Sequence, residues 1–145
     1  MYIGKITEPT DQLQEAFQRL IPQLGVHKVP PPQQEVIALL NAEGSTILVA
    51  REPDENGEIV GILSLTVYRV PTGIRSIIED VVVDQKMRRR GIGEALVRRA
   101  IELAREAGAS GVALTSNPQR EAANQLYQAM GFELRKTNPY FYKLK

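Results

Sequence analysis

The chain has 145 residues, of which 18 are Lys or Arg and 17 are Asp or Glu. This length predicts one compact domain over residues 1–145, and the near balance of charge argues against a dedicated nucleic-acid-binding protein. There is no cysteine, which excludes disulfides, thiolate metal sites and a cysteine nucleophile. The N-terminus has no apolar leader and the chain has no long apolar run, so we expect a cytoplasmic protein without signal peptide or membrane span.

The first half of the chain predicts one edge strand, two helices and an antiparallel meander. An amphipathic helix follows a Thr-Asp cap at Thr10 and ends at Gly25, because its apolar residues recur at helical spacing. Three consecutive prolines, at 30–32, then exclude regular structure before a second, shorter helix. The expected elements are a strand at 1–6, helices at 10–25 and 33–42, and strands at 46–52, 58–70 and 74–84.

The second half predicts a β-α-β unit followed by a further helix. The helix from Gly91 to Ala107 is the clearest in the chain, since one stripe of its surface is apolar and Gly108 ends it. After it we expect a buried strand at 111–116, a helix at 120–130, and strands at 132–136 and 139–144. An antiparallel meander followed by a β-α-β unit predicts an α/β fold with a mixed central sheet and helices on both faces.

A glycine-containing basic turn is the strongest functional signal. Residues 88–93 read Arg-Arg-Arg-Gly-Ile-Gly and lie between a buried strand and the clearest helix. The free backbone N–H groups and the positive dipole end of a helix N-terminus form an anion site. Gly91 and Gly93 let a ligand approach the backbone closely, and arginine matches phosphate geometry. The turn therefore predicts a pyrophosphate site, without choosing between a nucleotide and coenzyme A.

Two other interpretations of the basic run at 86–90 stay open at this point. A run of charge is often only a solvated face. A nucleic-acid patch is disfavoured, because no aromatic residues alternate with the basic ones and the chain has no basic surplus. Other phosphate-binding loops do not match: there is no G-x-x-x-x-G-K-[ST], and Leu96 stands where a Rossmann G-x-G-x-x-G needs its last glycine.

The pattern Arg88-x-x-Gly91-x-Gly93 resembles the Q/R-x-x-G-x-G/A signature of the GCN5-related N-acetyltransferase (GNAT) superfamily. The strand before it, 77–84, is similar to the family's central strand. Residues 121–132, an alanine-rich helix with a tyrosine that ends in Gly-Phe, resemble a second family hallmark. The resemblance covers the whole chain in length and element order.

This resemblance implies the GNAT fold and an acyltransferase that moves an acetyl group from acetyl-CoA to a primary amine of a small molecule or a protein. It implies direct attack on the thioester without an acyl-enzyme, no metal, and no nucleic-acid or membrane partner; a homodimer is compatible with it. The alternative is a CoA-binding sensor or interaction module that catalyses nothing.

The resemblance also assigns the cofactor contacts. The backbone of the strand should pair with the pantetheine arm, the turn should hold the pyrophosphate, and two asparagines should take the place of an asparagine that many relatives carry where this chain has Arg120. The implied cofactor-binding residues are Val81, Val82, Val83, Arg88, Arg89, Arg90, Gly91, Ile92, Gly93, Glu94, Asn117, Asn124 and Tyr127.

Two side chains are candidates for catalysis. Tyr127 matches the family's tyrosine near the thioester sulfur and could protonate the leaving thiolate; otherwise it is a core residue packed on Phe132. Glu79 is the candidate base, directly or through water; otherwise it is a solvent-facing carboxylate. Strand alternation would place Glu79 and Asp80 on opposite faces. The N–H of Val82 is the expected oxyanion donor.

Three further residues, in loops, could border the acceptor site. His27 lies between the first two predicted helices, and Asn138 and Tyr140 lie between the last two predicted strands. A surface position without function is the simpler interpretation of each.

Overall fold

The computed structural model describes residues 1–145. They form two compact units, residues 1–114 and residues 115–145. The first unit contains β1 (Tyr2–Ile6), α1 (Asp11–Leu20), the 3₁₀ turn η1 (Ile21–Leu24), α2 (Gln33–Asn41), β2 (Ser45–Glu52), β3 (Glu58–Val70), β4 (Gly73–Val83), the 3₁₀ turn η2 (Gln85–Met87), α3 (Ile92–Glu106) and β5 (Val112–Ala113). The second contains α4 (Glu121–Ala129). No helix combines the length and the apolar character that crossing a bilayer requires.

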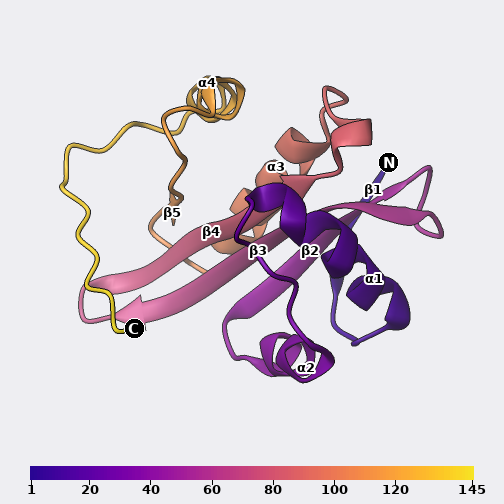
Figure 1. The fold of residues 1–145 in the computed structure, drawn as a ribbon. Helices are drawn as coiled ribbons and strands as arrows, with labels where there is room; N and C mark the ends of the chain where they lie inside the picture. Colours follow the sequence, from indigo (N-terminus) through magenta and orange to yellow (C-terminus); the bar gives the residue numbers. More distant parts are fainter. The chain divides into compact units, whose positions relative to one another are not determined.

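The first unit is built on a single five-stranded sheet with the order β1-β2-β3-β4-β5 (Figure 1). Neighbours among the first four strands are antiparallel, and β5 runs parallel to β4. The sheet is therefore mixed, with an antiparallel meander and a β-α-β unit, as the sequence predicts.

Helices cover both faces of this sheet. On one face, α1 and α2 bury Leu13, Phe17 and Val36 against strand residues such as Ile62. On the other face α3 packs closely against the strands. A Cβ added at Gly61 on β3 would lie only 3.2 Å from Leu96 Cδ1 on α3. Figure 1 shows α1 and α2 in front of the sheet and α3 behind it. The small residue on β3 thus brings the first turns of α3 close to the strands.

Local signals fix the first helix. The Thr10 side chain caps α1 by accepting a hydrogen bond from the Leu13 N–H at 3.1 Å, as expected from the Thr-Asp pair. The α-helix ends at Leu20 rather than at Gly25, because the chain tightens into η1, which carries Pro22 in its first turn.

A β-bulge interrupts β4. Ile62 on β3 pairs with Val82, and Ser64 pairs with Glu79, so Leu63 faces two residues of β4. Asp80 takes up the extra length in the left-handed region, with φ of 51°. The expected simple alternation of Glu79 and Asp80 is therefore wrong at this point, since a bulge breaks the two-residue repeat.

The C-terminal segment also differs from the prediction. The strands expected at 132–136 and 139–144 are absent, and β5 is shorter than the expected 111–116. A strand needs a partner for its backbone groups, and the backbone forms no hydrogen bond with backbone beyond Phe132. The apolar pattern there gave the expectation of strands, but the side chains of Tyr140 and Phe141 are 91% and 90% exposed.

Candidate active site

The turn between β4 and α3 presents backbone N–H groups at a helix start. Arg89 and Gly91 both have left-handed backbone, with φ of 66° and 79°, and this reverses the chain before the helix. The first helical bond at this end of α3 runs from the Ala95 N–H to the Gly91 oxygen at 3.0 Å. The N–H groups of residues 92–94 precede it and have no helical acceptor. They are therefore free for an anion, at the positive end of the α3 dipole.

The two glycines of the turn serve different purposes. Gly91 needs its positive φ, which other residues adopt only with strain. Gly93 has ordinary helical backbone, and a Cβ built there would meet nothing closer than Val83 Cγ2 at 3.7 Å, a normal contact. The protein itself therefore has room for a Cβ at Gly93, and the same space above the backbone is open to a ligand.

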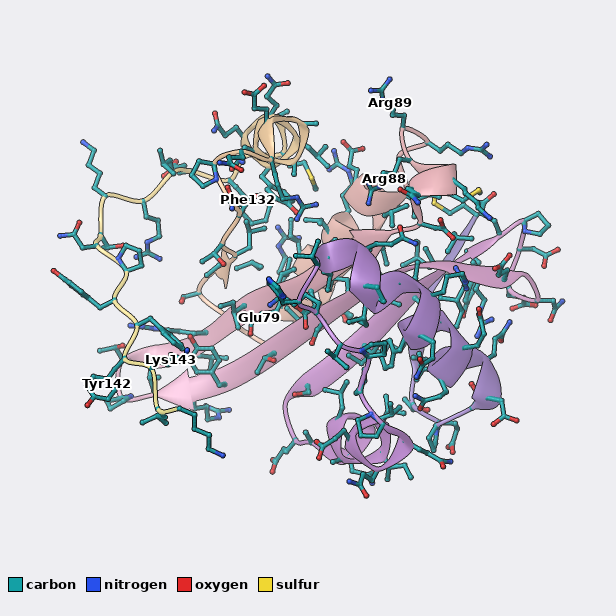
Figure 2. The ribbon with its side chains drawn as sticks, viewed as in Figure 1. Glu79, Arg88, Arg89, Phe132, Tyr142 and Lys143 are labelled. Carbon is teal, nitrogen blue, oxygen red and sulfur yellow. The ribbon has the colours of Figure 1, made fainter.

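Three exposed arginines surround these N–H groups. Arg88 is held against the strand because its Nε donates to the Val83 oxygen at 3.2 Å. Arg89 points outward from the turn (Figure 2). Arg90 is also exposed, so the turn combines backbone donors with positive charge. Such a combination suits a phosphate group.

One edge of β4 is open next to the turn. β5 pairs with β4 only at Ser76 and Ile77, so the edge that continues to Val83 has no partner strand. Such an edge can accept an extended ligand as an added strand. The Asp84 N–H bonds to the Val60 oxygen at 2.8 Å, and ladder bonds recur at every second residue. The N–H of Val82 therefore faces β3, and the expectation that it holds the oxyanion is wrong.

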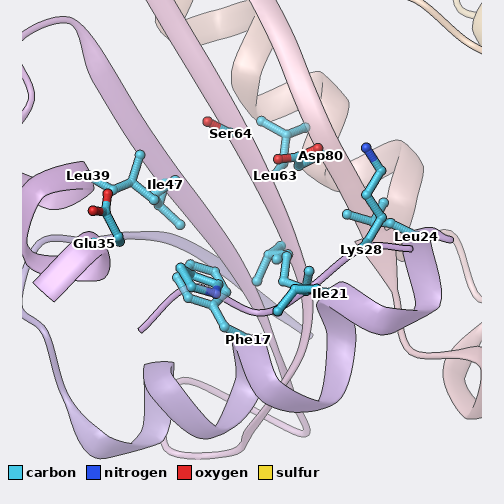
Figure 3. A pocket seen from close by; sticks show the side chains of 13 residues that line it. Phe17, Ile21, Leu24, Lys28, Glu35, Leu39, Ile47, Leu63, Ser64 and Asp80 are labelled. Carbon is cyan, nitrogen blue, oxygen red and sulfur yellow. The ribbon is translucent and has the colours of Figure 1, made fainter. Parts of the chain in front are cut away.

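A cavity of about 380 Å³ lies in the same unit, on the face covered by α1 and α2. Its walls are mostly apolar, with a lysine, a serine and two carboxylates among them. Figure 3 shows Asp80 and Glu35 on opposite sides of the cavity. The lining residues are Phe17, Ile21, Leu24, Lys28, Val29, Pro31, Glu35, Leu39, Ile47, Ile62, Leu63, Ser64 and Asp80.

The bulge decides which acidic residue of β4 meets this cavity. Asp80 lines it together with Ser64. Glu79, the predicted base, pairs with Ser64 across the ladder, and paired residues share a face. Glu79 therefore projects toward the same face as the cavity, although it is not among the lining residues. Both carboxylates are exposed at the bulge.

Tyr127 lies on α4 in the second unit, where its ring packs edge-on against Phe132 with centroids 5.8 Å apart. Burial raises the pKa of the Tyr127 hydroxyl above its usual range, and the nearby Arg120 charge opposes this only in part. The hydroxyl thus keeps its proton over a wide pH range. The packing on Phe132 is the one expected if Tyr127 were a core residue, and it is compatible with an acid as well.

The two predicted asparagine contacts have local partners. Asn124 Nδ2 donates to the oxygens of Asn117 and Arg120 at 2.9 and 2.8 Å, and Asn117 Oδ1 accepts from the Gln119 N–H. These bonds shape the turn that leads into α4. Both donors of the Asn124 amide are used, so only its oxygen is left for a ligand.

Sequence reasoning missed most of the cavity. Lys28, Glu35 and Asp80 were not predicted as site residues. The irregular proline-rich segment before α2 was the only signal near Lys28 and Glu35, and Asp80 had none. His27 is not among the lining residues, and Tyr140 and Asn138 lie in the exposed C-terminal segment. No group of three or more metal-ligating side chains is present.

Residues 11–132 match the model of the family described as "Acetyltransferase (GNAT) family". N-acetyltransferase family 8 member 2 of Rattus norvegicus is 36% identical over 104 residues, which are 70% of this chain and 43% of that protein. N-acetyltransferase 8 of Homo sapiens is 33% identical over 71% of this chain and 44% of its own length. The chain thus spans less than half the length of these curated relatives.

A solved structure with a similar fold is the aminoglycoside acetyltransferase meta-AAC0020 from an uncultured soil metagenomic sample, crystallised with trehalose. It superposes with a TM-score of 0.84 over 99% of this chain and 96% of its own, at 21% sequence identity. At that identity the likeness shows a common fold and carries no information about the acceptor.

Proposed function

We propose that this chain, which belongs to the GNAT acetyltransferase family, transfers an acetyl group from acetyl-CoA to the nitrogen of a primary amine. The turn before α3 carries the proposal, because it offers three backbone N–H groups without helical acceptors, flanked by three arginines. We further propose that residues 1–145 act as one domain.

Acetyl-CoA would bind along the turn and the open edge of β4. The pyrophosphate would accept hydrogen bonds from the N–H groups of residues 92–94, with Arg88–Arg90 adding charge. The pantetheine arm would extend β4 by pairing with backbone groups near Val81 and Val83. Val82 lies between them. Because its N–H faces β3, it would not pair with the pantetheine arm and would only help to shape the site. The thioester carbonyl would be polarised by an N–H on this open edge.

The cavity beneath α1 and α2 would hold the acceptor amine. Its carboxylates at Glu35 and Asp80 favour a cationic ligand, while most of its remaining lining is apolar. An amine with an apolar body would bury that surface, at about 25 cal/mol for each Å² removed from water. We therefore expect such amines to react better than densely hydroxylated ones.

The chemistry would proceed by direct attack. The cationic amine first loses one proton to water, and its neutral nitrogen then forms a bond to the thioester carbon. Glu79, directly or through water, takes the second proton, which the nitrogen loses as the bond forms. The carbon–sulfur bond then breaks, and Tyr127 donates its proton to the departing thiolate. Exchange with water afterwards returns a proton to Tyr127 and removes one from Glu79. The products are an N-acetylated amine and CoA with a free thiol. The raised pKa of Tyr127 keeps the hydroxyl protonated, as a donor must be, but it also makes the hydroxyl a weaker acid.

A CoA-binding sensor without catalysis is the second candidate, since its site would need the turn and the open edge but no reacting groups. The two functions separate in one experiment. Purified protein is incubated with acetyl-CoA and a panel of apolar, polar and peptidyl amines, and free CoA thiol and acetylated product are both measured. Equal amounts of thiol and product support the enzyme. CoA binding by calorimetry without product from any amine supports the sensor, and no CoA binding at millimolar ligand overturns both.

A further inference from the structure

Asp84, between β4 and η2, is fixed from several directions. Its backbone N–H bonds to the Val60 oxygen at 2.8 Å, and its own oxygen accepts from the Met87 N–H at 2.8 Å. Its carboxylate caps η2 by accepting from the Lys86 N–H at 3.2 Å. The residue is 7% exposed, so the start of the turn is set by a nearly buried charge.

The charge of Asp84 is balanced from α1. Arg19 Nη1 lies 3.0 Å from Asp84 Oδ2, and Arg19 Nη2 donates to the Ile59 oxygen on β3 at 2.8 Å. The other two acidic partners of Arg19, Glu15 and Glu58, have side chains that are 59% and 64% exposed, against 9% for Asp84. An ion pair shielded from water couples its partners more strongly than an exposed one. The contact with Asp84 is therefore the one that ties Arg19 to the turn.

A second side chain of the same helical segment reaches the turn. Gln23, in η1, accepts a hydrogen bond from the Gln85 N–H at 3.0 Å. Its amide also donates to the Arg19 oxygen at 3.2 Å, so the two contacts support each other. Residues 84 and 85 are thus both held by side chains that come from more than 60 positions earlier in the chain.

We propose that Arg19 and Gln23 are positioning residues for the cofactor, which hold the pyrophosphate turn in its binding geometry through Asp84 and Gln85. This rests on the proposed binding of acetyl-CoA at the turn. Neither side chain needs to touch the cofactor. Both belong to the segment whose Phe17 and Ile21 line the cavity, so one segment of the chain serves both sides of the site.

The test compares two acetyl donors in Arg19→Met and Gln23→Leu. Acetyl-CoA carries the pyrophosphate, whereas S-acetylpantetheine lacks it. If the network positions the turn, the KM for acetyl-CoA rises about tenfold in Arg19→Met and less in Gln23→Leu, because the latter loses a neutral contact. The kcat at saturating acetyl-CoA and the kcat/KM for S-acetylpantetheine stay within about twofold. Glu15→Gln, which removes an exposed partner of Arg19 without touching the turn, is the matched control and keeps the parental KM.

A merely structural network gives another result. The melting temperature falls, but the dissociation constant of CoA measured by calorimetry on the folded variants equals that of the parent, and this overturns the proposal. Equal loss of activity with both donors also overturns it. If Arg19→Met does not fold, Gln23→Leu and Arg19→Lys carry the test, since Arg19→Lys keeps the charge but not the fork that reaches both Asp84 and Ile59. Failure of the parent itself to bind CoA would reject the proposed function instead.

Discussion

The turn before α3 and the cavity under α1 and α2 are built in opposite ways. The turn owes its ligand-facing groups, which are three backbone N–H groups and three arginine side chains, to a short stretch of consecutive residues, 88–94. The cavity collects single side chains from α1, η1, α2 and three strands, with the segment before α2. A site formed by one short stretch of the chain suits one kind of ligand. A site formed by scattered side chains can change the ligand it binds through single substitutions. In the proposed function, the motif therefore fixes the cofactor side, and the acceptor side depends on the side chains of the individual protein.

In the proposed mechanism the turn and the cavity bind the two substrates, but neither supplies an acid for the departing thiolate. We therefore expect the largest effect at Tyr127. Tyr127→Phe removes only the hydroxyl and keeps the ring on Phe132. We expect kcat to fall by about 10²–10⁴-fold, the usual range for a positioned acid. The dissociation constant of CoA should change little, because the donated proton matters once charge develops on sulfur. A kcat within threefold of the parent would remove Tyr127 from the mechanism.

The next effect concerns the cavity side and decides which carboxylate acts as base. Glu79→Gln should lower kcat by about a hundredfold, the lower end of the range for a general base, since water can partly replace it. Asp80→Asn should mainly raise the KM of the amine, because Asp80 lines the cavity. Asparagine tolerates the left-handed backbone at this position, so the bulge should persist. If Asp80→Asn lowers kcat and Glu79→Gln does not, the two roles must be exchanged.

The sequence predicts these two regions unequally well. The turn was predictable because the charge and the positive-φ glycine that make it are adjacent in the chain. The sheet and its two helical layers were predictable from periodicity. The β4 bulge was not, because Asp80 gives no local signal, and the bulge alone brings Asp80 to the cavity wall. The same holds for Arg19 and Asp84, which are 65 positions apart and meet only through folding.

The C-terminal segment marks another limit of sequence reasoning. Its alternation of apolar and polar residues after Gly131 is typical of strands, yet the structure forms none there. The alternation of side chains indicates which residues would share one face of a sheet. Whether a strand forms depends on backbone hydrogen bonds to a neighbouring strand.

A smaller effect is expected at Gly93 in the turn, where folding and CoA binding should respond differently to one substitution. Gly93→Ala should leave folding unchanged or stabilise it by up to about 1 kcal/mol, because alanine favours a helix and its Cβ has room in the protein. The added methyl group should crowd the pyrophosphate and raise the dissociation constant of CoA about tenfold or more. Calorimetry and thermal unfolding of the same sample check both halves. Parental CoA affinity in this variant would place the pyrophosphate elsewhere.

The smallest expected effect is a pH dependence of the free energy of unfolding. It arises from Asp84 at the turn and not from the apolar cavity. Burial alone would raise the pKa of the Asp84 carboxyl, but the hydrogen bonds from the Lys86 N–H and Arg19 outweigh it and hold the pKa below the ordinary 3.8. A lowered pKa in the folded state stabilises the protein above pH 3.8, and this contribution is lost as the pH falls through the folded value.

Asp84→Asn lacks this charge at every pH, so its free energy of unfolding should be lower than the parent's near neutral pH, by about 1 kcal/mol. The difference should shrink as the pH falls below 3.8, because the parent then begins to lose the same contribution. Denaturant titrations at several pH values measure this directly, with Glu58→Gln as control, because it removes an exposed partner of the same arginine. A difference between Asp84→Asn and the parent that stays constant down to pH 3 would show that the Asp84 charge does not stabilise the turn.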